Sequence, residues 1–332
     1  MEKKRIAVVG SGSWGTAISA LLAKNGHDIT LWSWKKEESD AIALHRENKE
    51  FLPGIMLDEN ISYTSDISCV ENKDFVVLVT PSPVVRSTAR SMSKYITKGT
   101  ILVILSKGLE EGSLKTLSQV VEEEIPQSRI VVMSGPSHAE EVARFIPTAN
   151  VAASCDADAI KHVQDSFMCE YFRVYSSDDV LGVQLGAALK NVMALCAGII
   201  DGMGFGDNTK AALMTRGIKE ISRLGIKMGA KPETFYGLSG IGDLIVTCTS
   251  MHSRNRRAGI LIGQGNSLEE TLKQIHMVVE GVNCASTAKA LSLKYGVEMP
   301  IINEAYDVLY NNKSPRDAIF NLMCRDKKDE II

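Results

Sequence analysis

Lys190 stands in an unusual setting for a lysine. It lies within the apolar stretch 180–200, with apolar neighbours on most sides. A lysine is almost never buried unless it is paired, and burial together with a second nearby cation lowers the pKa of its ammonium group. Such an amine is suited to general acid–base catalysis near neutral pH. The alternative is an ammonium group that reaches solvent along its aliphatic stem, and we favour the catalytic interpretation.

A basic segment, Ser253-Arg254-Asn255-Arg256-Arg257, precedes the apolar run 258–262. Serine is a favoured helix N-cap, so the arginines are expected in a first helical turn, where the helix macrodipole favours anions. Free backbone N–H groups and an arginine side chain together form a phosphate site. We therefore predict that the substrate carries a phosphate. The alternative is an exposed basic turn whose charges are screened by solvent.

Asp243 lies among small and apolar residues shortly before that segment. Its carboxylate is able to bind a substrate hydroxyl or to pair with a lysine, and it is equally suited to capping a helix. The six histidines form no cluster with metal-ligand spacing, and Cys248 and His252, four residues apart, are a weak signal. We predict no metal site.

A glycine-rich turn follows the apolar run 6–9, and apolar residues at helical spacing follow the turn. Gly10, Gly12 and Gly15 have the G-x-G-x-x-G spacing of dinucleotide-binding turns. The first glycine permits the turn, the second lets the backbone approach a pyrophosphate, and the third lets helix and strand pack closely. Because a strand and a helix are both expected around the turn, we favour a dinucleotide site over a chance group of glycines.

Short apolar runs alternate with helix-like stretches over the first half of the chain. Runs rich in Val and Ile that are separated by amphipathic helices indicate a doubly wound parallel sheet. The expected strands are residues 6–9, 28–32, 75–80, 100–105, 130–133, 150–153 and 171–174. Ligands bind at the carboxyl ends of such strands. Three loops, 80–83, 106–109 and 134–137, should therefore line one crevice, in which Lys107 is the charged member.

The pattern becomes helical after Asp178-Asp179, which is suited to a helix N-cap. We expect a dinucleotide-binding domain over residues 1–178 and an all-helical substrate and catalytic domain over 179–332. The expected helices are residues 180–200, 209–228, 254–263, 281–294, 300–310 and 315–323. Although the first of these is apolar enough to suggest a membrane span, the lysine near its middle opposes membrane insertion. We expect a helix buried in protein.

The composition of the 332-residue chain is that of a soluble globular protein. A net charge of −3 gives no reason to expect nucleic acid as a partner. The seven cysteines are scattered and form no C-x-x-C pair, which is typical of reduced thiols in the cytoplasm. The N-terminus leads directly into a strand and shows no signal peptide. We expect a cytoplasmic protein.

The end of the second expected strand bears on the choice of cofactor. A chain that binds NAD often places an acidic residue there to hold the adenosine ribose. Here Trp34, Lys35 and Lys36 follow the strand, and no acidic residue occurs before Glu37. The lysines would attract a 2′-phosphate, which slightly favours NADP over NAD. The alternative is that they open a solvated helix.

Seven stretches across nearly the whole chain resemble bacterial-type NAD(P)-dependent glycerol-3-phosphate dehydrogenases. They are residues 10–16 (GSGSWGT), 106–108 (SKG), 134–137 (SGPS), 189–191 (LKN), 240–244 (GIGDL), 253–255 (SRN) and 279–281 (VEG). The resemblance implies reversible reduction of dihydroxyacetone phosphate to sn-glycerol 3-phosphate for phospholipid synthesis, and it implies a homodimer. The expected α/β fold class is thus a doubly wound parallel, Rossmann-like sheet domain followed by an all-α domain.

The resemblance also implies roles for individual residues, with Lys190 as the proton-transferring lysine. Substrate-contacting positions are Lys107, Gly135, Ser137, Asp243, Ser253, Arg254 and Asn255. Cofactor-contacting positions are Ser13, Trp14, Lys107, Ala139, Arg254, Val278 and Glu280, beside Gly10, Gly12 and Gly15 of the turn. The family often has arginine or histidine at the cofactor position that Trp34 occupies here, which leaves the choice between NAD and NADP open.

On this hypothesis hydride passes to the substrate carbonyl carbon while Lys190 donates a proton to the developing alkoxide. Lys107 stabilises the charge on that oxygen, and Asp243 orients Lys190 or a substrate hydroxyl. Two alternatives remain at this point: a related two-domain dehydrogenase of another small hydroxy acid, and a dinucleotide-binding regulator without turnover. The basic segment at Arg254 argues against the first, and the buried amine argues against the second. The loop 202–208 has no assigned role.

Overall fold

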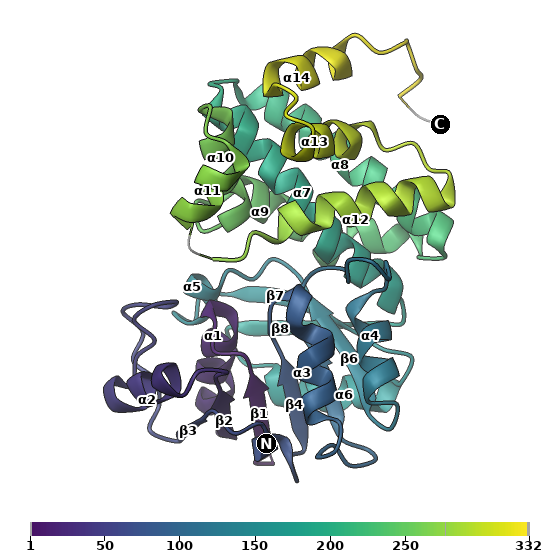
Figure 1. Cartoon of the computed structure of the whole chain (residues 1–332). Coiled ribbons are helices and arrows are strands. Elements are labelled where there is room, and N and C mark those ends of the chain that lie inside the picture. The colour runs from purple at the N-terminus through teal and green to yellow at the C-terminus, as the bar shows by residue number, and fades with distance from the viewer. Residues whose placement is uncertain (1, 276, 331–332) are drawn as a thin grey trace.

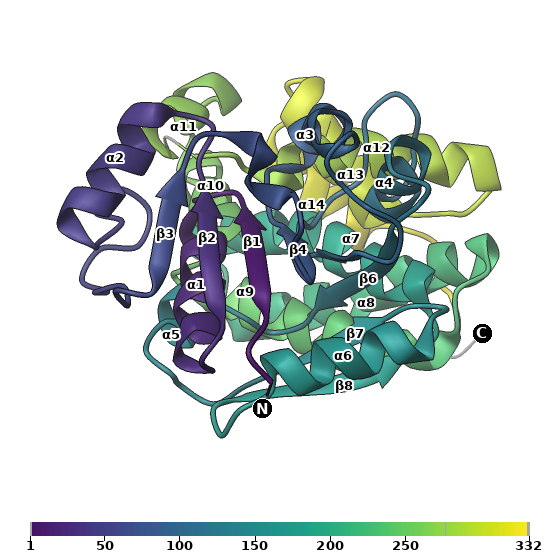
Figure 2. The same cartoon turned by 90° about the horizontal axis from the view of Figure 1, so that it is seen from below.

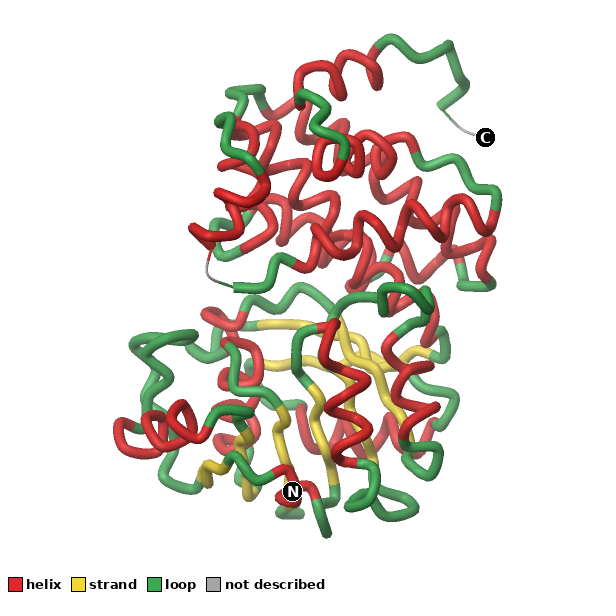
Figure 3. The backbone as a smooth tube through the Cα atoms, viewed as in Figure 1, coloured by secondary structure: helices red, strands yellow, loops and turns green. Residues whose placement is uncertain are grey.

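The computed structural model describes residues 2–275 and 277–330. Figure 1 shows two stacked parts: a sheet with helices around it below, and a bundle of helices above. The last strand, β8 (Phe172–Ser177), leads into the long helix α7 (Val180–Gly202), where the helical part begins. Figure 3 shows strands in the lower part alone, so the chain changes from α/β to all-α at this passage.

An eight-stranded sheet with the order β3-β2-β1-β4-β5-β6-β7-β8 forms the centre of the lower part. Beside β8, its strands are β1 (Arg5–Val9), β2 (Asp28–Trp32), β3 (Ile61–Thr64), β4 (Phe75–Leu78), β5 (Ile101–Ile104), β6 (Arg129–Ser134) and β7 (Thr148–Ala153). The strands from β3 to β6 are parallel. The α/β class and the mostly parallel sheet are thus confirmed.

Two features of the sheet differ from the prediction. The strand β7 runs antiparallel to β6, and β8 follows the direction of β7. A parallel connection needs a crossover that usually contains a full helix, whereas only the four-residue helix α5 (Ala139–Val142) lies between β6 and β7. The edge strand β3 was not expected, because its four residues alternate in polarity and pair on one side alone.

Helices cover both faces of the sheet, as the apolar strands require. On one face Ile6 and Val8 of β1 pack with α1 (Ser13–Lys24) and α6 (Ala157–Phe167). On the other face Ala7 and Val9 pack with α3 (Val85–Met92) and α4 (Leu117–Glu124). Helix α2 (Lys36–His45) lies beside the outer strands β2 and β3 (Figure 2). The carboxyl ends of the parallel strands face the helical part (Figure 1).

The helical part is built around α7, which begins where the side chain of Asp179 accepts the N–H of Gly182 at 2.9 Å. This bond confirms the predicted N-cap. Around α7 pack α8 (Asp207–Met228), α9 (Asp243–Thr249), α10 (Arg254–Gly263) and α12 (Glu280–Tyr295). The remaining helices are α11 (Leu268–Ile275), α13 (Pro300–Tyr310) and α14 (Pro315–Met323). Although α7 has the length and composition of a membrane span, it is buried in protein.

Helices α9 and α11 and two short helical segments were not predicted. The segments are a 3₁₀ turn, Pro232–Tyr236, and a π-helical turn, Leu238–Gly242, directly before α9. Glycine and proline within 232–242 interrupt any helical periodicity in the sequence, and α11 has only eight residues. The π-helical turn matters because it sets the position of Asp243, the first residue of α9.

Candidate active site

A buried ion-pair cluster lies where α7, α9 and the loop after β5 meet. The ammonium nitrogen Nζ of Lys190 donates to Oδ1 of Asp243 at 2.8 Å and to the hydroxyl of Thr247 at 2.6 Å. The ammonium group of Lys107 donates to the other carboxylate oxygen of Asp243 at 2.7 Å. Lys190 is 5% exposed and Asp243 is 1% exposed. Two cations therefore share one buried carboxylate.

Burial lowers the pKa of Lys190 to about 8; the charge of Asp243 opposes this effect and the charge of Lys107 adds to it. For Asp243, burial alone would raise the carboxyl pKa. The charges and hydrogen bonds of the two lysines outweigh burial, so the pKa is lowered and the group is an anion. The cluster thus holds an amine that exchanges its proton near neutral pH, next to a fixed negative charge.

Close backbone packing places the carboxylate beside Lys190. The π-helical turn before α9 passes directly over Gly186 of α7, where an added Cβ would lie 2.6 Å from the carbonyl oxygen of Ser239. Within the turn, a Cβ on Gly240 would lie 2.2 Å from the carbonyl oxygen of Phe235. Since neither glycine can be replaced without moving backbone, the local glycines bring Asp243 within hydrogen-bond distance of Lys190.

The strand-end loops form the sheet side of the same site. Lys107 also donates to the carbonyl of Gly135 at 3.1 Å, and this carbonyl accepts the hydroxyl of Ser137 at 2.9 Å. The hydroxyl of Ser134 lies 3.4 Å from the Asp243 carboxylate. Gly135 has a φ of +156°, a backbone conformation that L side chains rarely adopt. The loops after β5 and β6 thus meet at Asp243.

The three arginines of the basic segment have different surroundings. Ser253 caps α10, since its hydroxyl accepts the N–H of Arg256 at 3.2 Å. Arg256 pairs with Asp201 at 2.7 Å, and Arg257 is exposed. The side chain of Arg254 is half-buried and forms no ion pair with any residue that the structure describes. Burial lowers its pKa, which the more distant carboxylates partly offset. Of the two arginines of this segment without an ion pair in the described chain, Arg254 is thus the half-buried one, and it is the better placed to hold an anionic ligand.

An amide bridge holds the start of α10 beside the cluster. The side chain of Asn255 donates to Oδ1 of Asn191, the neighbour of Lys190, at 3.0 Å. Its oxygen accepts the N–H of Gly281, at the start of α12, at 2.8 Å. The sequence analysis did not single out Asn191 or Thr247 as site residues. Asn191 directly follows Lys190 in the sequence. Thr247 lies four residues, or one helical turn, after Asp243, a spacing that brings two side chains together on a helix. These two positions relative to Lys190 and Asp243 are the signal that would have found them.

Glycines on both helices let α10 pack backbone to backbone against α7. A Cβ on Gly198 would lie 2.0 Å from the carbonyl oxygen of Arg256, and a Cβ on Gly259 would lie 2.0 Å from that of Leu195. Gly202 and Gly263 repeat the arrangement one turn further on. This close contact sets how far Arg254 lies from the Lys190 cluster.

A second contact joins the two parts of the molecule at Glu280, the first residue of α12. Its carboxylate accepts the backbone N–H of Ser82 at 3.0 Å and the Ser82 hydroxyl at 2.5 Å. Burial raises the pKa of Glu280, and the bonds from Ser82 oppose that shift. Val278, shortly before this helix, is partly exposed, and Ala139 is buried at the start of α5.

The glycine-rich turn fits a dinucleotide. Gly10 has a φ of +124°, and a Cβ on Gly15 would lie 1.8 Å from the Gly10 carbonyl oxygen. A Cβ on Gly12 would meet no atom within 4 Å, so this backbone is open to an approaching group. Helix α1 begins at Ser13 without a side-chain cap, and the indole N–H of Trp14 is buried without a partner in the described chain. The uncapped backbone N–H groups at this helix start are suited to an anion.

The residues after β2 lie apart from the Lys190 cluster, at the outer edge of the sheet. Trp34 is 72% exposed. The ammonium group of Lys35 lies 4.9 Å from the centre of the Trp34 ring, and Lys36 pairs with Asp40 at 2.6 Å. Both lysines that favoured a 2′-phosphate are therefore engaged with neighbours in this structure.

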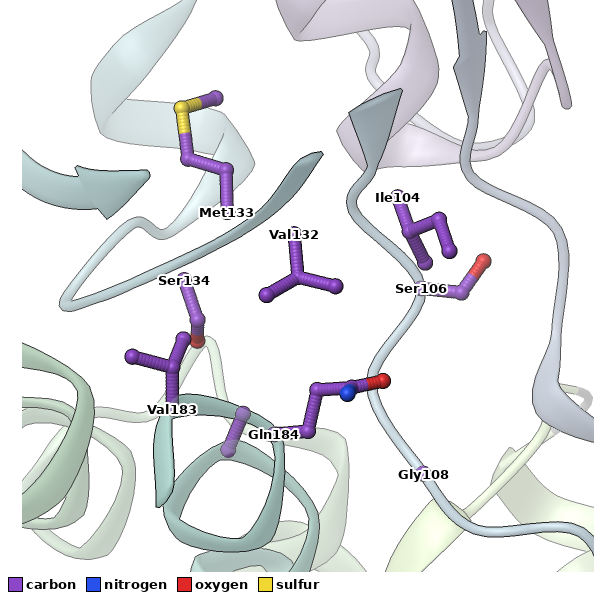
Figure 4. A pocket seen from close by; sticks show the side chains of 9 residues that line it. Ile104, Ser106, Gly108, Val132, Met133, Ser134, Val183 and Gln184 are labelled. Atoms are coloured by element: carbon purple, nitrogen blue, oxygen red, sulfur yellow. The ribbon is translucent and has the colours of Figure 1, made fainter. Parts of the chain in front are cut away.

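A small cavity of about 10 Å³ lies between the ends of β5 and β6 and helix α7. Figure 4 shows its lining, in which Ser106, Ser134 and Gln184 are the polar side chains. Its volume is about that of a single water molecule, so it is not a substrate pocket. Among the described residues, no group of three or more His, Cys, Asp and Glu side chains is arranged to hold a metal ion.

A glycine-rich turn on a doubly wound sheet that faces a buried lysine–aspartate cluster is typical of a dehydrogenase. Family models agree: NAD-dependent glycerol-3-phosphate dehydrogenase N-terminus matches residues 5–160, and the corresponding C-terminus matches residues 179–320. The chain belongs to this family, whose enzymes interconvert dihydroxyacetone phosphate and glycerol 3-phosphate with NAD(P). The predicted resemblance and enzyme class are confirmed.

Curated relatives and a solved structure support this assignment. The glycerol-3-phosphate dehydrogenase [NAD(P)+] of Fusobacterium nucleatum is 52% identical over 330 residues, covering 98% of each chain. The enzyme of the same name from Agathobacter rectalis is 53% identical over 327 residues, covering 98% of this chain and 97% of the relative. The crystal structure of glycerol-3-phosphate dehydrogenase from Coxiella burnetii is 36% identical, with a TM-score of 0.94, and the match covers 97% of this chain and 99% of that one.

Proposed function

We propose that Lys190 is the proton donor in the reduction of dihydroxyacetone phosphate and that Arg254 binds the phosphate of this substrate. The observation that carries the proposal is the buried pair of Lys190 and Asp243 beside an arginine that has no ion-pair partner in the described chain. The nicotinamide ring, when bound, supplies the hydride for the substrate carbonyl carbon. The chain's own residues supply the proton, the orientation and the charge.

The ammonium group of Lys190 donates its proton to the substrate oxygen as that oxygen gains negative charge. Asp243 and Thr247 hold the nitrogen in place, since each accepts one of its hydrogen bonds. With a pKa of about 8, the amine is mostly protonated at neutral pH and yet gives up its proton readily. In the reverse direction the neutral amine takes the proton from the alcohol.

Lys107 supplies a second positive charge at the same point. Together with Lys190 and Asp243 it gives the cluster a net charge of about +1, which stabilises a developing alkoxide. The carbonyl of Gly135 and the hydroxyl of Ser137 lie beside Lys107 and line the substrate position.

The substrate phosphate binds at the start of α10. Arg254 provides the charged fork, and the first N–H groups of the helix provide backbone donors. Ser253 and Asn255 set the geometry of this end, because the first caps the helix and the second ties it to α7 and α12. Arg256 is assigned to structure, because it is paired with Asp201.

The proposed cofactor position is supported by the glycine-rich turn and by two contacts between the parts of the molecule, Lys107 with Asp243 and Glu280 with Ser82. Gly10, Gly12 and Gly15 shape the turn, and Ser13 and Trp14 supply donors at the start of α1. The remaining proposed contacts are Trp34, Lys107, Ala139, Arg254, Val278 and Glu280. Of these, Glu280 lies against the loop after β4, so it reaches the crevice at the strand ends.

We also propose two domains, residues 1–178 and 179–332, a homodimer and a cytoplasmic location serving phospholipid synthesis. The end of β8 at Ser177 and the start of α7 at Val180 support the domain limits. The seven cysteines are all unpaired, which suits a reducing compartment. Light scattering of the purified protein measures the mass and so tests the dimer.

The reaction and the phosphate site are tested together by following NAD(P)H oxidation at 340 nm. Dihydroxyacetone phosphate and unphosphorylated dihydroxyacetone are compared at equal concentration, each with NADH and with NADPH. We expect turnover of the phosphorylated ketone and a value of kcat/KM lower by about 10²-fold or more without the phosphate. Equal rates with the two ketones would contradict the phosphate site, and absence of turnover would contradict the proposed reaction.

A further inference from the structure

An acidic side chain lies against the glycine-rich turn at the end where an adenosine ribose is expected. The hydroxyl of Ser11, between the first two glycines of the turn, donates a hydrogen bond to Oε1 of Glu38 in α2. In doubly wound dinucleotide folds, an acidic residue near the end of the second strand binds the ribose 2′-hydroxyl of NAD. From the sequence, Glu37 is the first acidic residue after this strand, and no role is predicted for Glu38.

The position of Ser11 is determined by its backbone. Its carbonyl accepts the side-chain amide of Asn48 at 2.6 Å and the hydroxyl of Thr16 at 3.1 Å. Asn48 is 1% exposed, and its amide also donates to Thr16 at 2.8 Å. With the carbonyl held in this way, the Ser11 hydroxyl is directed toward α2. The half-buried carboxylate of Glu38 is therefore held at the rim of the turn rather than free in solvent.

The nearby lysines form no ion pair with this carboxylate. Lys36 is paired with Asp40, and Lys35 lies over the ring of Trp34. Among the described residues, no cation lies within ion-pair distance of Glu38. This end of the turn consequently presents a carboxylate acceptor without an ion-pair partner among the described residues, and the neutral indole of Trp34 is exposed nearby in sequence.

We propose that Glu38 makes this enzyme select NAD(H) over NADP(H). Its carboxylate accepts a hydrogen bond from the 2′-hydroxyl of NAD, whereas the 2′-phosphate of NADP meets a like charge at the same place. This inference rests on the proposed dinucleotide site at the glycine-rich turn and is independent of the role of Lys190. It predicts a preference for NAD, whereas Lys35 and Lys36 slightly favoured NADP in the sequence.

Calorimetry with cofactor fragments tests the inference without any turnover. ADP-ribose and 2′-phospho-ADP-ribose are titrated into the full-length protein, Glu38→Gln and Glu37→Gln. We expect the wild-type protein to bind ADP-ribose at least about tenfold more tightly than the phosphorylated fragment, because like charges in contact are strongly disfavoured. Glu38→Gln should reduce this ratio by about tenfold. Glutamine still accepts the bond from Ser11, so the turn keeps its shape.

Glu37→Gln is the matched control, since it removes the same charge from the neighbouring exposed residue. We expect it to leave the ratio of the two affinities unchanged. The ratio of kcat/KM for NADH and NADPH in the three proteins should follow the binding ratios.

Three results would overturn the inference: tighter binding of the phosphorylated fragment by the wild-type protein, equal effects of the two variants, or absence of binding by both fragments. Selective binding without reduction of dihydroxyacetone phosphate would leave it standing and would contradict the proposed reaction instead.

Discussion

In the sheet-bearing part of the molecule, Gly12 faces open space, whereas in the helical part Gly259 lies against the backbone of another helix. A Cβ on Gly12 would meet no protein atom within 4 Å, and a Cβ on Gly259 would lie 2.0 Å from the carbonyl oxygen of Leu195. The same residue type thus leaves room for a ligand in one part and for a neighbouring helix in the other. The sheet thus leaves backbone accessible at its glycine-rich turn, whereas the helical part uses glycine for close helix packing.

The charged groups follow the same division. The long helix α7 buries Lys190, and burial lowers the pKa of its amine. In the sheet-bearing part, Lys107 lies in the loop after β5 and Glu38 lies in the first turn of α2, and both are partly exposed. Because Asp243 joins Lys190 to Lys107, this ion-pair cluster is complete only where the two parts of the molecule meet. We propose that the chemistry takes place at this junction, with substrate and cofactor contacts from both parts.

The largest expected effect is loss of the buried amine. Lys190→Met should lower kcat for reduction of dihydroxyacetone phosphate by about 10²–10⁴-fold, the usual contribution of general acid catalysis. Cofactor binding, measured by titration of protein fluorescence with NADH, should stay within a few-fold of the wild-type value. The exposed Lys227 on the same part of the chain offers the control Lys227→Met. A kcat within a few-fold of wild type would remove Lys190 from the proton transfer.

The next effect separates substrate binding from chemistry. Arg254→Gln should raise KM for dihydroxyacetone phosphate by about 10²-fold, because a desolvated charged contact is lost. The rate with unphosphorylated dihydroxyacetone should hardly change. Arg257→Gln, an exposed neighbour on the same helix, serves as the control. If both variants raise KM alike, the basic segment acts through its general charge and not through Arg254.

Two glycine substitutions test directly whether Gly12 leaves room for a ligand and Gly259 leaves room for a neighbouring helix. Gly12→Ala should leave the unfolding temperature nearly unchanged and weaken NADH binding by roughly tenfold, since a methyl group would occupy the approach of the pyrophosphate. Gly259→Ala should lower the free energy of unfolding by roughly 1–3 kcal/mol, because α7 and α10 must move apart.

Gly206→Ala is the control for Gly259→Ala, because a Cβ there meets nothing and its φ is negative. Thermal unfolding and fluorescence titration of all three variants provide the measurements. If Gly12→Ala lowered the stability, or if Gly259→Ala left it unchanged, the two glycines would not differ in the way that the structure indicates.

The smallest effect concerns pH. Since reduction needs the protonated amine, kcat should fall as pH rises through about 8, the pKa of Lys190. Lys107 lowers that pKa by its like charge. Lys107→Gln should therefore move the falling limb to higher pH, which a series of kcat values between pH 6 and 10 measures. A limb that moves to lower pH would show that Lys107 does not act on the amine through its charge.

Much of the fold could be read from local patterns in the sequence. Seven of the strands and the main helices follow from apolar periodicity, and the N-cap follows from the aspartates at 178 and 179, which the bond from Gly182 to Asp179 confirms. The direction of β7 was missed, because strand direction depends on the length of the connection through α5 and not on the strand's own residues. The short edge strand β3 carries too few apolar residues to stand out.

For the site, too, some features could be predicted from the sequence and others could not. The sequence by itself determined which residues are chemically unusual: a lysine in an apolar helix, arginines at a helix start and glycines at fixed spacing. Each of these signals lies within a few neighbouring residues, so it needs no fold to be recognised.

Only the tertiary structure decided which partner each unusual residue has. It paired Asp243 with both Lys190 and Lys107, engaged Arg256 with Asp201 while leaving Arg254 without an ion pair in the described chain, and brought Glu38 to the glycine-rich turn. These partners lie far apart along the chain. Their distances depend on how helices and strands pack, which is set by close backbone contacts and burial, and no pattern in a short stretch of sequence records them.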